Sequence, residues 1–233
     1  MIFWIIDFMI TSLLFDFDGL ILDTETAEIR TWQKLYAEYG YPFPHDDFIQ
    51  TVGGYGISHF DAALHLHDLT RGSLNADVLR IRFRNESADE ILRSPVLPGV
   101  TDIITEAKRR SMKLAVASSS PHSWVDTHLT RLGLYQQFDQ IICGDDVPFG
   151  RTKPKPDLFL RALDQLHVRA NEAMIFEDSP NGVEAANAAG IAVVLAPNPT
   201  TLLLPFKGNY LKLRSLAEMS LDEMIAHFDA VQS

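Results

Sequence analysis

The chain carries the stretch Leu13-Leu14-Phe15-Asp16-Phe17-Asp18-Gly19-Leu20-Ile21-Leu22-Asp23-Thr24-Glu25 close to its amino end. An apolar run typical of a β-strand leads directly into two aspartates one residue apart, followed by a glycine that permits a tight turn. Residues two apart share a face of a strand, so Asp16 and Asp18 should point the same way where the strand ends. Two carboxylates this close repel unless a cation lies between them, so the pair predicts a site for a hard metal such as Mg²⁺. Taken alone, the pattern also fits an aspartate-rich turn.

The composition is ordinary for a globular protein and excludes several classes of partner. Of 233 residues, 46% are hydrophobic and 22% are charged, which is enough to build a large core. The formal net charge of -11 argues against nucleic acid or an anionic membrane as partner. The one cysteine, Cys143, leaves no internal disulfide and fits a reducing cytoplasm, where we expect the protein to act. Cys143 lies in an apolar run and is expected to be buried packing.

The first ten residues are strongly apolar but do not resemble a targeting segment. They lack a basic leader and a small-residue cleavage site, and Asp7 leaves too short a run for a membrane span. We expect either an additional packed element or a start-site artefact. Because the strand before Asp16 needs only a few preceding residues, Met9 is predicted to be the natural start.

A helical insert is predicted directly after the first strand. One helical face carries the apolar residues Ile29, Trp32, Leu35, Tyr36 and Tyr39. Gly40 and Pro42 then end the helix. Further helices are predicted over 58–66 and 75–92, the second with Asn75 as N-cap. Residues 25–93 are therefore predicted to form a small all-helical cap domain, and residues 1–24 plus 94–233 a catalytic core.

From Pro98 onward the pattern alternates between helix and strand. Strands are predicted at 113–117, 138–143, 173–176 and 192–196, with amphipathic helices between them. Ser120 is predicted to cap a helix whose first residue is Pro121, and a capping box at 220–223 opens the last helix. This alternation predicts an α/β fold with a doubly wound parallel sheet and helices on both faces.

Polar residues follow four of these predicted strands. In chain order they are Asp16 and Asp18, then Ser118, then Lys153 in the loop after the third strand, and finally Glu177 and Asp178. Each has a plain alternative, such as a helix-capping serine, a surface lysine or a solvated strand end. Functional groups of an open α/β sheet gather at the carboxyl ends of its strands. The joint occurrence at four strand ends therefore predicts one site.

These motifs resemble those of the haloacid dehalogenase superfamily. The four matching segments are Asp16-Phe17-Asp18-Gly19, Ala117-Ser118-Ser119, Lys153-Pro154-Lys155-Pro156-Asp157 and Phe176-Glu177-Asp178-Ser179-Pro180-Asn181-Gly182. The resemblance covers nearly the whole chain from Thr11, and the helical insert resembles the cap of the β-phosphoglucomutase-like branch. It implies a Rossmann-like core with the cap closing over the strand ends.

The resemblance also implies a catalytic role for each residue. Asp16 would be the nucleophile that forms an aspartyl-phosphate, and Asp18 the general acid and later the base. Ser118 would donate to a phosphoryl oxygen, and Lys153 would neutralise its charge. Arg151 and Lys155 would add positive charge nearby, without an assigned role.

The same resemblance implies a magnesium site. Mg²⁺ would be bound by the carboxylates of Asp16 and Asp178 and by the backbone carbonyl of Asp18, with Glu177 as an auxiliary ligand. The implied activity is hydrolysis of a small phosphorylated metabolite, either a sugar phosphate or a nucleotide-like compound. We expect a monomer whose substrate choice resides in the cap, above all in residues 53–58.

Two alternatives remain at this point. A phospho-accepting signalling receiver also gathers aspartates and a lysine around Mg²⁺, but the insert at 25–93 weighs against it. A sugar-phosphate mutase shares the aspartyl-phosphate step. The β-phosphoglucomutases that the chain resembles carry a histidine five residues after the aspartate corresponding to Asp23, where this chain has Glu28. This difference favours a phosphatase.

Overall fold

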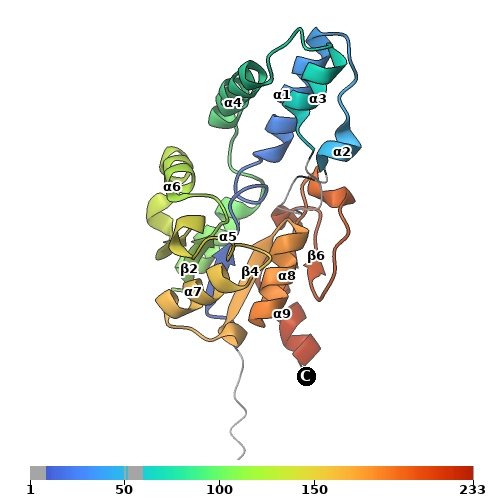
Figure 1. Ribbon diagram of the computed structural model, residues 1–233. Helices are drawn as coiled ribbons and strands as arrows, with labels where there is room; N and C mark the ends of the chain where they lie inside the picture. The colour runs from blue at the N-terminus through green and yellow to red at the C-terminus, as the bar shows by residue number, and fades with distance from the viewer. Residues whose placement is uncertain (1–8, 50, 52–59, 233) are drawn as a thin grey trace, which may run out of the picture.

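The protein is built around a single parallel sheet (Figure 1). The computed structural model describes residues 9–49, 51 and 60–232. The strand order is β3-β2-β1-β4-β5-β6, and every described pairing of neighbours is parallel. The strands are β1 (Ser12–Phe15), β2 (Lys113–Ala117), β3 (Gln140–Ile142), β4 (Ala173–Glu177), β5 (Ala192–Leu195) and β6 (Leu211–Lys212). The predicted α/β fold class is confirmed.

Helices cover both faces of the sheet because consecutive strand residues point to opposite sides. Leu13 and Phe15 of β1 pack in the same apolar cluster as helices α5 (Val100–Arg109), α6 (His122–Arg131) and α9 (Leu221–Gln232). Leu14 packs on the other face in the same cluster as α7 (Asp157–Leu166) and α8 (Pro180–Ala189). Apart from Ser12, Lys113 and Glu177 at their ends, the four central strands β1, β2, β4 and β5 are apolar, as is typical of a parallel sheet that is covered on both faces.

The register of the central strands brings the polar strand ends together. Phe15, the last residue of β1, lies opposite Val116 of β2 on one side and Phe176 of β4 on the other. The strand order switches direction at β1: the chain first adds β2 and β3 on one side of β1 and then β4, β5 and β6 on the other. A crevice opens at such a switch point. Asp16, the residue after Phe15, therefore lies at the centre of the carboxyl edge of the sheet.

A second group of helices follows β1 and has its own apolar cluster. It consists of α1 (Glu25–Glu38), α2 (His45–Ile49), α3 (Ala62–Leu69) and α4 (Ala76–Arg93). Trp32 and Tyr36 of α1 pack against the other helices of the group, and the rings of Trp32 and Phe83 stack with centroids 4.5 Å apart. Figure 1 shows these helices together, away from the helices that flank the sheet.

The structure corrects one prediction about local structure and extends others. Helix α6 begins at His122, and Pro121 occupies its N-cap position without a side-chain hydrogen bond. The prediction of Ser120 as a helix cap is therefore wrong, because the Ser120 hydroxyl donates to Asp18 instead. Helix α2 and strand β6 were not predicted. Predictions that concern residues 1–8 and 53–58 lie outside the described residues.

Other local predictions are confirmed. Asn75 caps α4, its side-chain oxygen accepting hydrogen bonds from the backbone N–H groups of Asp77 and Val78. Ser220 and Glu223 form the predicted capping box. Cys143 is fully buried. Within the described part of the chain, every helix is too short or too polar to cross a membrane.

Substituting the Asn75 cap should destabilise the helices around α1 without changing the sheet. We expect Asn75→Ala to lower the free energy of unfolding by about 1 kcal/mol, because two N–H groups of α4 lose their acceptor. Asn75→Asp is the matched control, since its carboxylate still accepts both hydrogen bonds. Urea denaturation would measure both variants. An equal loss in Asn75→Asp and Asn75→Ala would contradict the capping role.

Candidate active site

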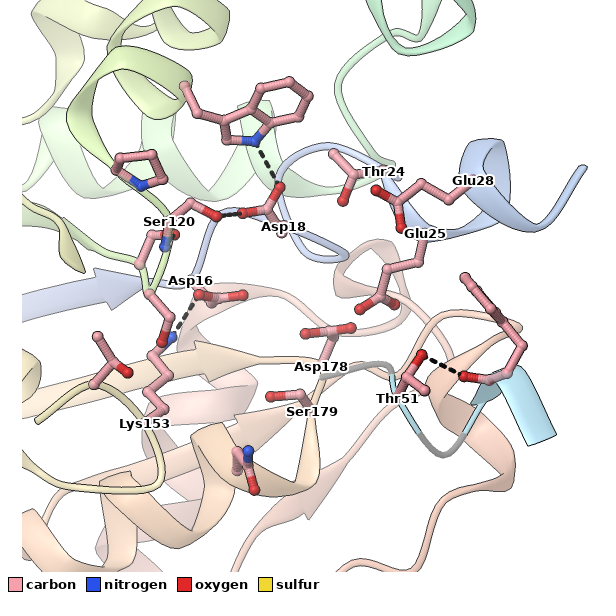
Figure 2. Close-up of a pocket in the computed structure, with 17 residues that line it drawn as sticks. Asp16, Asp18, Thr24, Glu25, Glu28, Thr51, Ser120, Lys153, Asp178 and Ser179 are labelled. Carbon is pink, nitrogen blue, oxygen red and sulfur yellow. Dashed lines mark hydrogen bonds and ion pairs between the residues drawn. The ribbon is translucent and has the colours of Figure 1, made fainter. Parts of the chain in front are cut away.

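A cavity of about 580 Å³ lies between the carboxyl edge of the sheet and the first helices. Its walls include the strand-end residues Asp16, Ser118 and Asp178 on one side, and Glu25 and Glu28 of α1 on the other. Figure 2 shows Asp16, Asp178 and Glu25 converging from separate elements. The structure thus brings together residues that are as far apart in sequence as Asp16 and Asp178.

Lys153 and two carboxylates form a buried ion-pair cluster. The ammonium nitrogen donates to Asp16 Oδ1 at 2.5 Å and to Glu177 Oε1 at 2.6 Å, and it lies 4.9 Å from the centroid of the Phe159 ring. The lysine side chain is only 6% exposed. Burial alone would lower the pKa of Lys153, but the charges of Asp16 and Glu177 outweigh it and hold that pKa above its ordinary value. Lys153 is therefore a fixed cation beside Asp16.

Glu177 orients this cluster. Its second oxygen, Oε2, accepts hydrogen bonds from the backbone N–H groups of Asp178 and Ser179 and from the Ser179 hydroxyl. The carboxylate also lies against Gly182, where a Cβ atom would come within 1.8 Å of Glu177 Cδ. Glu177 is thus held by its own turn and by Lys153, and its role as an auxiliary metal ligand stays a prediction.

Asp178 presents one oxygen that has no partner. Its Oδ2 accepts hydrogen bonds from Asn198 Nδ2 at 2.9 Å and Thr201 Oγ1 at 3.3 Å. Its Oδ1 is buried and has no hydrogen-bond partner among the described residues. Burial, reinforced by the charges of Glu25, Glu177 and Asp16, raises the pKa of Asp178 well above its ordinary value. An orphaned buried carboxylate oxygen is costly unless another group, such as a cation, satisfies it.

The acidic groups near Asp178 fit a hard cation. Ligand oxygens of Asp16, Glu177 and Asp178 all lie within 4.8 Å of one another. Burial, augmented by the charges of Glu177 and Asp18, raises the pKa of Asp16 to about 7 even though Lys153 opposes the shift. Carboxylate oxygens are the ligands that Mg²⁺ prefers. The donor set is therefore suitable for the predicted metal.

Asp18 is held by two donors from the segment after β2. Ser120 Oγ donates to Oδ2 at 2.6 Å and Trp124 Nε1 donates to Oδ1 at 2.9 Å (Figure 2). The neighbouring Gly19 has a φ of +81°, and a Cβ there would approach Asp178 Oδ2 to 2.2 Å. Only glycine allows the turn after Asp18 to pass so close to Asp178.

Ser118 lies at the end of β2, where the sequence predicts it. The residue is 1% exposed, lines the cavity, and its Oγ accepts a hydrogen bond from the backbone N–H of Ser120 at 3.0 Å. This contact uses a lone pair and leaves the hydroxyl hydrogen available to a group in the cavity.

Helix α1 contributes two more carboxylates. Asn198 Nδ2 donates to Glu25 Oε2 at 2.7 Å. Burial raises the pKa of Glu25 to about 8 despite that hydrogen bond, and the negative charges of Asp18 and Glu28 add to the shift. Burial, followed by the charge of Asp18, raises the pKa of Glu28 to about 7. Among the described residues that line the cavity, Lys153 is the sole cation, so the carboxylates outnumber it greatly.

Several members of this site were not assigned by sequence reasoning. Ser120, Trp124, Asn198 and Thr201 hold the predicted aspartates in place, yet a serine run, a helical tryptophan and a loop asparagine carry no distinctive spacing. Arg151 pairs with Asp157 at 2.7 Å outside the set of residues that line the cavity. The contacts that orient the site are therefore tertiary in origin.

Comparison with known proteins places this geometry in context. The sequence pattern of haloacid dehalogenase-like hydrolases matches residues 13–196. Over 223 residues the chain is 37% identical to YhcW of Bacillus subtilis, a protein named as a phosphatase by inference. The match covers 95% of this chain and 99% of that protein. It is 33% identical to the phosphorylated carbohydrates phosphatase of Thermotoga maritima, covering 77% of this chain and 82% of that protein.

Solved structures show the same similarity. A mutant of CbbY from Rhodobacter sphaeroides, in complex with xylulose-(1,5)bisphosphate, superposes with a TM-score of 0.69 and 27% identity, covering 93% of this chain and 99% of that one. A Thermotoga maritima protein, described by inference as a β-phosphoglucomutase, superposes with a TM-score of 0.71 and 26% identity. The match covers 94% of this chain and 99% of that one.

The half-buried Glu28 should make stability depend on pH in the metal-free protein. Its pKa is about 7 when folded, against 4.5 for an ordinary glutamate, so ionisation destabilises the folded state as the pH rises between these values. Glu28→Gln should therefore stabilise the protein, and the gain at pH 8 should exceed that at pH 5.5 by about 1–2 kcal/mol.

Urea denaturation in the presence of a chelator would measure this difference. The same substitution at the exposed Glu184 serves as the control and should change stability by less than about 0.5 kcal/mol at either pH. A gain in Glu28→Gln that is equal at both pH values would contradict the buried-carboxyl assignment.

Proposed function

The chain belongs to the haloacid dehalogenase-like hydrolases and is a phosphatase, and from this premise we propose that it hydrolyses a small sugar phosphate through a phosphorylated Asp16 with Mg²⁺ bound beside it. The observation that carries the proposal is the placement of Asp16. This carboxylate lies at the centre of the carboxyl edge, bonded to a buried lysine and facing a cavity of about 580 Å³. A cavity of this size accommodates a small metabolite.

The metal would be bound by the carboxylates of Asp16 and Asp178 and by the backbone carbonyl of Asp18. Its charge would neutralise the phosphoryl oxygens and the crowded carboxylates around them. The partnerless Oδ1 of Asp178 supports this assignment, because a cation would satisfy that buried oxygen.

Lys153 and Ser118 would bind the phosphoryl group. Lys153 is held in position by Asp16 and Glu177, so its charge is already in place when the substrate arrives. Ser118 has a hydroxyl hydrogen to donate to a phosphoryl oxygen. Donors and charges that are fixed before the reaction stabilise developing negative charge without a cost of reorganisation.

Asp16 would act as the nucleophile. One of its oxygens forms a bond to phosphorus while the bond from phosphorus to the sugar oxygen breaks, and Asp18 gives its proton to the departing alkoxide. Water then attacks the phosphorus of the aspartyl-phosphate, and Asp18 takes a proton from that water. Inorganic phosphate leaves and Asp16 is restored. The bonds from Ser120 and Trp124 to Asp18 would keep its carboxyl group aimed into the cavity.

The substrate class is supported by the relatives. One is named for phosphorylated carbohydrates, another is a fructose-1-phosphate phosphatase, and the structure of CbbY contains a sugar bisphosphate. Glu28 supports hydrolysis over transfer within a sugar, because its carboxyl group stands near Asp18 where the mutases that the chain resembles use a histidine. A cap domain over residues 25–93 would then provide the contacts that distinguish one sugar from another.

Replacing the nucleophile should abolish turnover. Asp16→Asn keeps the volume of the side chain but removes its nucleophilic oxygen, so phosphate release from an aryl phosphate should fall by roughly a thousandfold or more. Asp164→Asn, an equivalent change at an exposed position of α7, should retain full activity. Circular dichroism would confirm that both variants are folded. Substantial activity in folded Asp16→Asn would refute the proposed role.

A coupled assay would separate a phosphatase from a mutase. The protein is incubated with β-glucose 1-phosphate and a trace of the 1,6-bisphosphate, while glucose 6-phosphate and free phosphate are followed together. We expect phosphate release that stops on chelation of Mg²⁺, and faster release from sugar phosphates than from nucleoside monophosphates. Rapid formation of glucose 6-phosphate with negligible free phosphate would show that the chain is a mutase.

A further inference from the structure

The side-chain amide of Asn198 links two carboxylates of the cavity. Asn198 lies in the loop after β5, and its Nδ2 donates to Asp178 Oδ2 at 2.9 Å and to Glu25 Oε2 at 2.7 Å. Figure 2 shows Asp178 and Glu25 facing each other across this region. Both amide hydrogens are thus used on the two carboxylates.

The loop holds this amide in a fixed orientation. Asn198 Oδ1 accepts hydrogen bonds from the backbone N–H groups of Thr200 and Thr201 at 2.8 and 2.9 Å, and the backbone N–H of Asn198 donates to Thr201 Oγ1 at 3.1 Å. The residue is only 7% exposed. An amide whose oxygen is bound by two N–H groups cannot rotate without losing them, so the NH₂ group must face the carboxylates.

This arrangement determines which oxygen of Asp178 is free. Oδ2 receives hydrogen bonds from Asn198 and from the Thr201 hydroxyl, while Oδ1 receives none from the described residues. Oδ2 occupies the space beside Gly19, where a Cβ atom would come within 2.2 Å of it, so only glycine at this position leaves room for the oxygen. Asp178 therefore has one oxygen committed to the protein and one directed away from these donors.

We propose that Asn198, assisted by Thr201, is a positioning residue for a divalent cation: it fixes Oδ2 of Asp178 so that Oδ1 is presented to the metal. The inference rests on the proposed function, because it concerns the Mg²⁺ assigned there. Through its second hydrogen, Asn198 also connects the first residue of α1 to the same ligand. Partners that orient a metal ligand typically contribute 10- to 100-fold to metal affinity.

A second asparagine provides a matched control. Asn187 Nδ2 donates to the backbone carbonyls of Val183 and Asn209, and its Oδ1 accepts from the backbone N–H of Asn209. It thus makes a comparable number of hydrogen bonds, but none of them to a carboxylate and none to a residue that lines the cavity. Asn187→Ala should therefore affect stability without affecting metal binding.

Calorimetric titration of the chelator-treated full chain with MgCl₂ alone tests the proposal without turnover. We expect Asn198→Ala to raise the dissociation constant for Mg²⁺ at least tenfold. Thr201→Val, which keeps the shape of the side chain but removes the hydroxyl donor, should raise it by about threefold. Asn187→Ala should match the wild type. Thermal melts followed by circular dichroism would report on the folding of each variant.

The outcomes distinguish this inference from the proposed function. Wild-type affinity in folded Asn198→Ala would overturn the positioning role and leave the proposed phosphatase untouched. If Asn198→Ala does not fold, Thr201→Val decides, and an unchanged dissociation constant there overturns the role. A wild-type protein that binds no Mg²⁺ would overturn the proposed metal and this inference together.

Discussion

The structure depends on the electrostatic balance around Lys153. This ammonium group is buried between Asp16 and Glu177, and burying one charge without partners would be far too costly. The partners, however, bring more negative charge than one lysine can neutralise, because Asp178 and Glu25 lie beside them. Burial, reinforced by the neighbouring negative charges, raises the pKa values of Asp16 and Glu25. A cavity with this excess of negative charge favours a bound cation. Such a cation and Lys153 could together bind an anionic group.

The parallel sheet explains how so many charged groups come to one place. Strand β1 lies between β2 and β4 in register, so the residues that follow each strand emerge side by side. The central strands are apolar except at their ends and pack on both faces, so the polar residues that follow them gather at the carboxyl edge of the sheet. Gly19, in the turn after Asp18, and Gly182, in the first turn of α8, leave room for the carboxylates of Asp178 and Glu177.

Helices α1 to α4 complete the cavity from the other side. Their own apolar cluster, which includes the stacked rings of Trp32 and Phe83, packs the four helices against one another. Helix α1 begins directly at the cavity, so Glu25 and Glu28 reach it from their first turn. The helix that carries these acids is thereby joined to Asp178, the proposed metal ligand, through a single asparagine.

The sequence by itself determined the fold class and which polar residues follow the strands. Strand-helix alternation predicts the parallel sheet. Asp16, Ser118 and Asp178 directly follow β1, β2 and β4, at the carboxyl edge where the functional groups of such a sheet gather. Only the tertiary structure decided how these groups are oriented. Ser120 reads as a helix cap in sequence but donates to Asp18, since local capping and a distant carboxylate compete for one hydroxyl. Asn198 has no local signature at all, because its partners are 20 and 173 residues away in the chain.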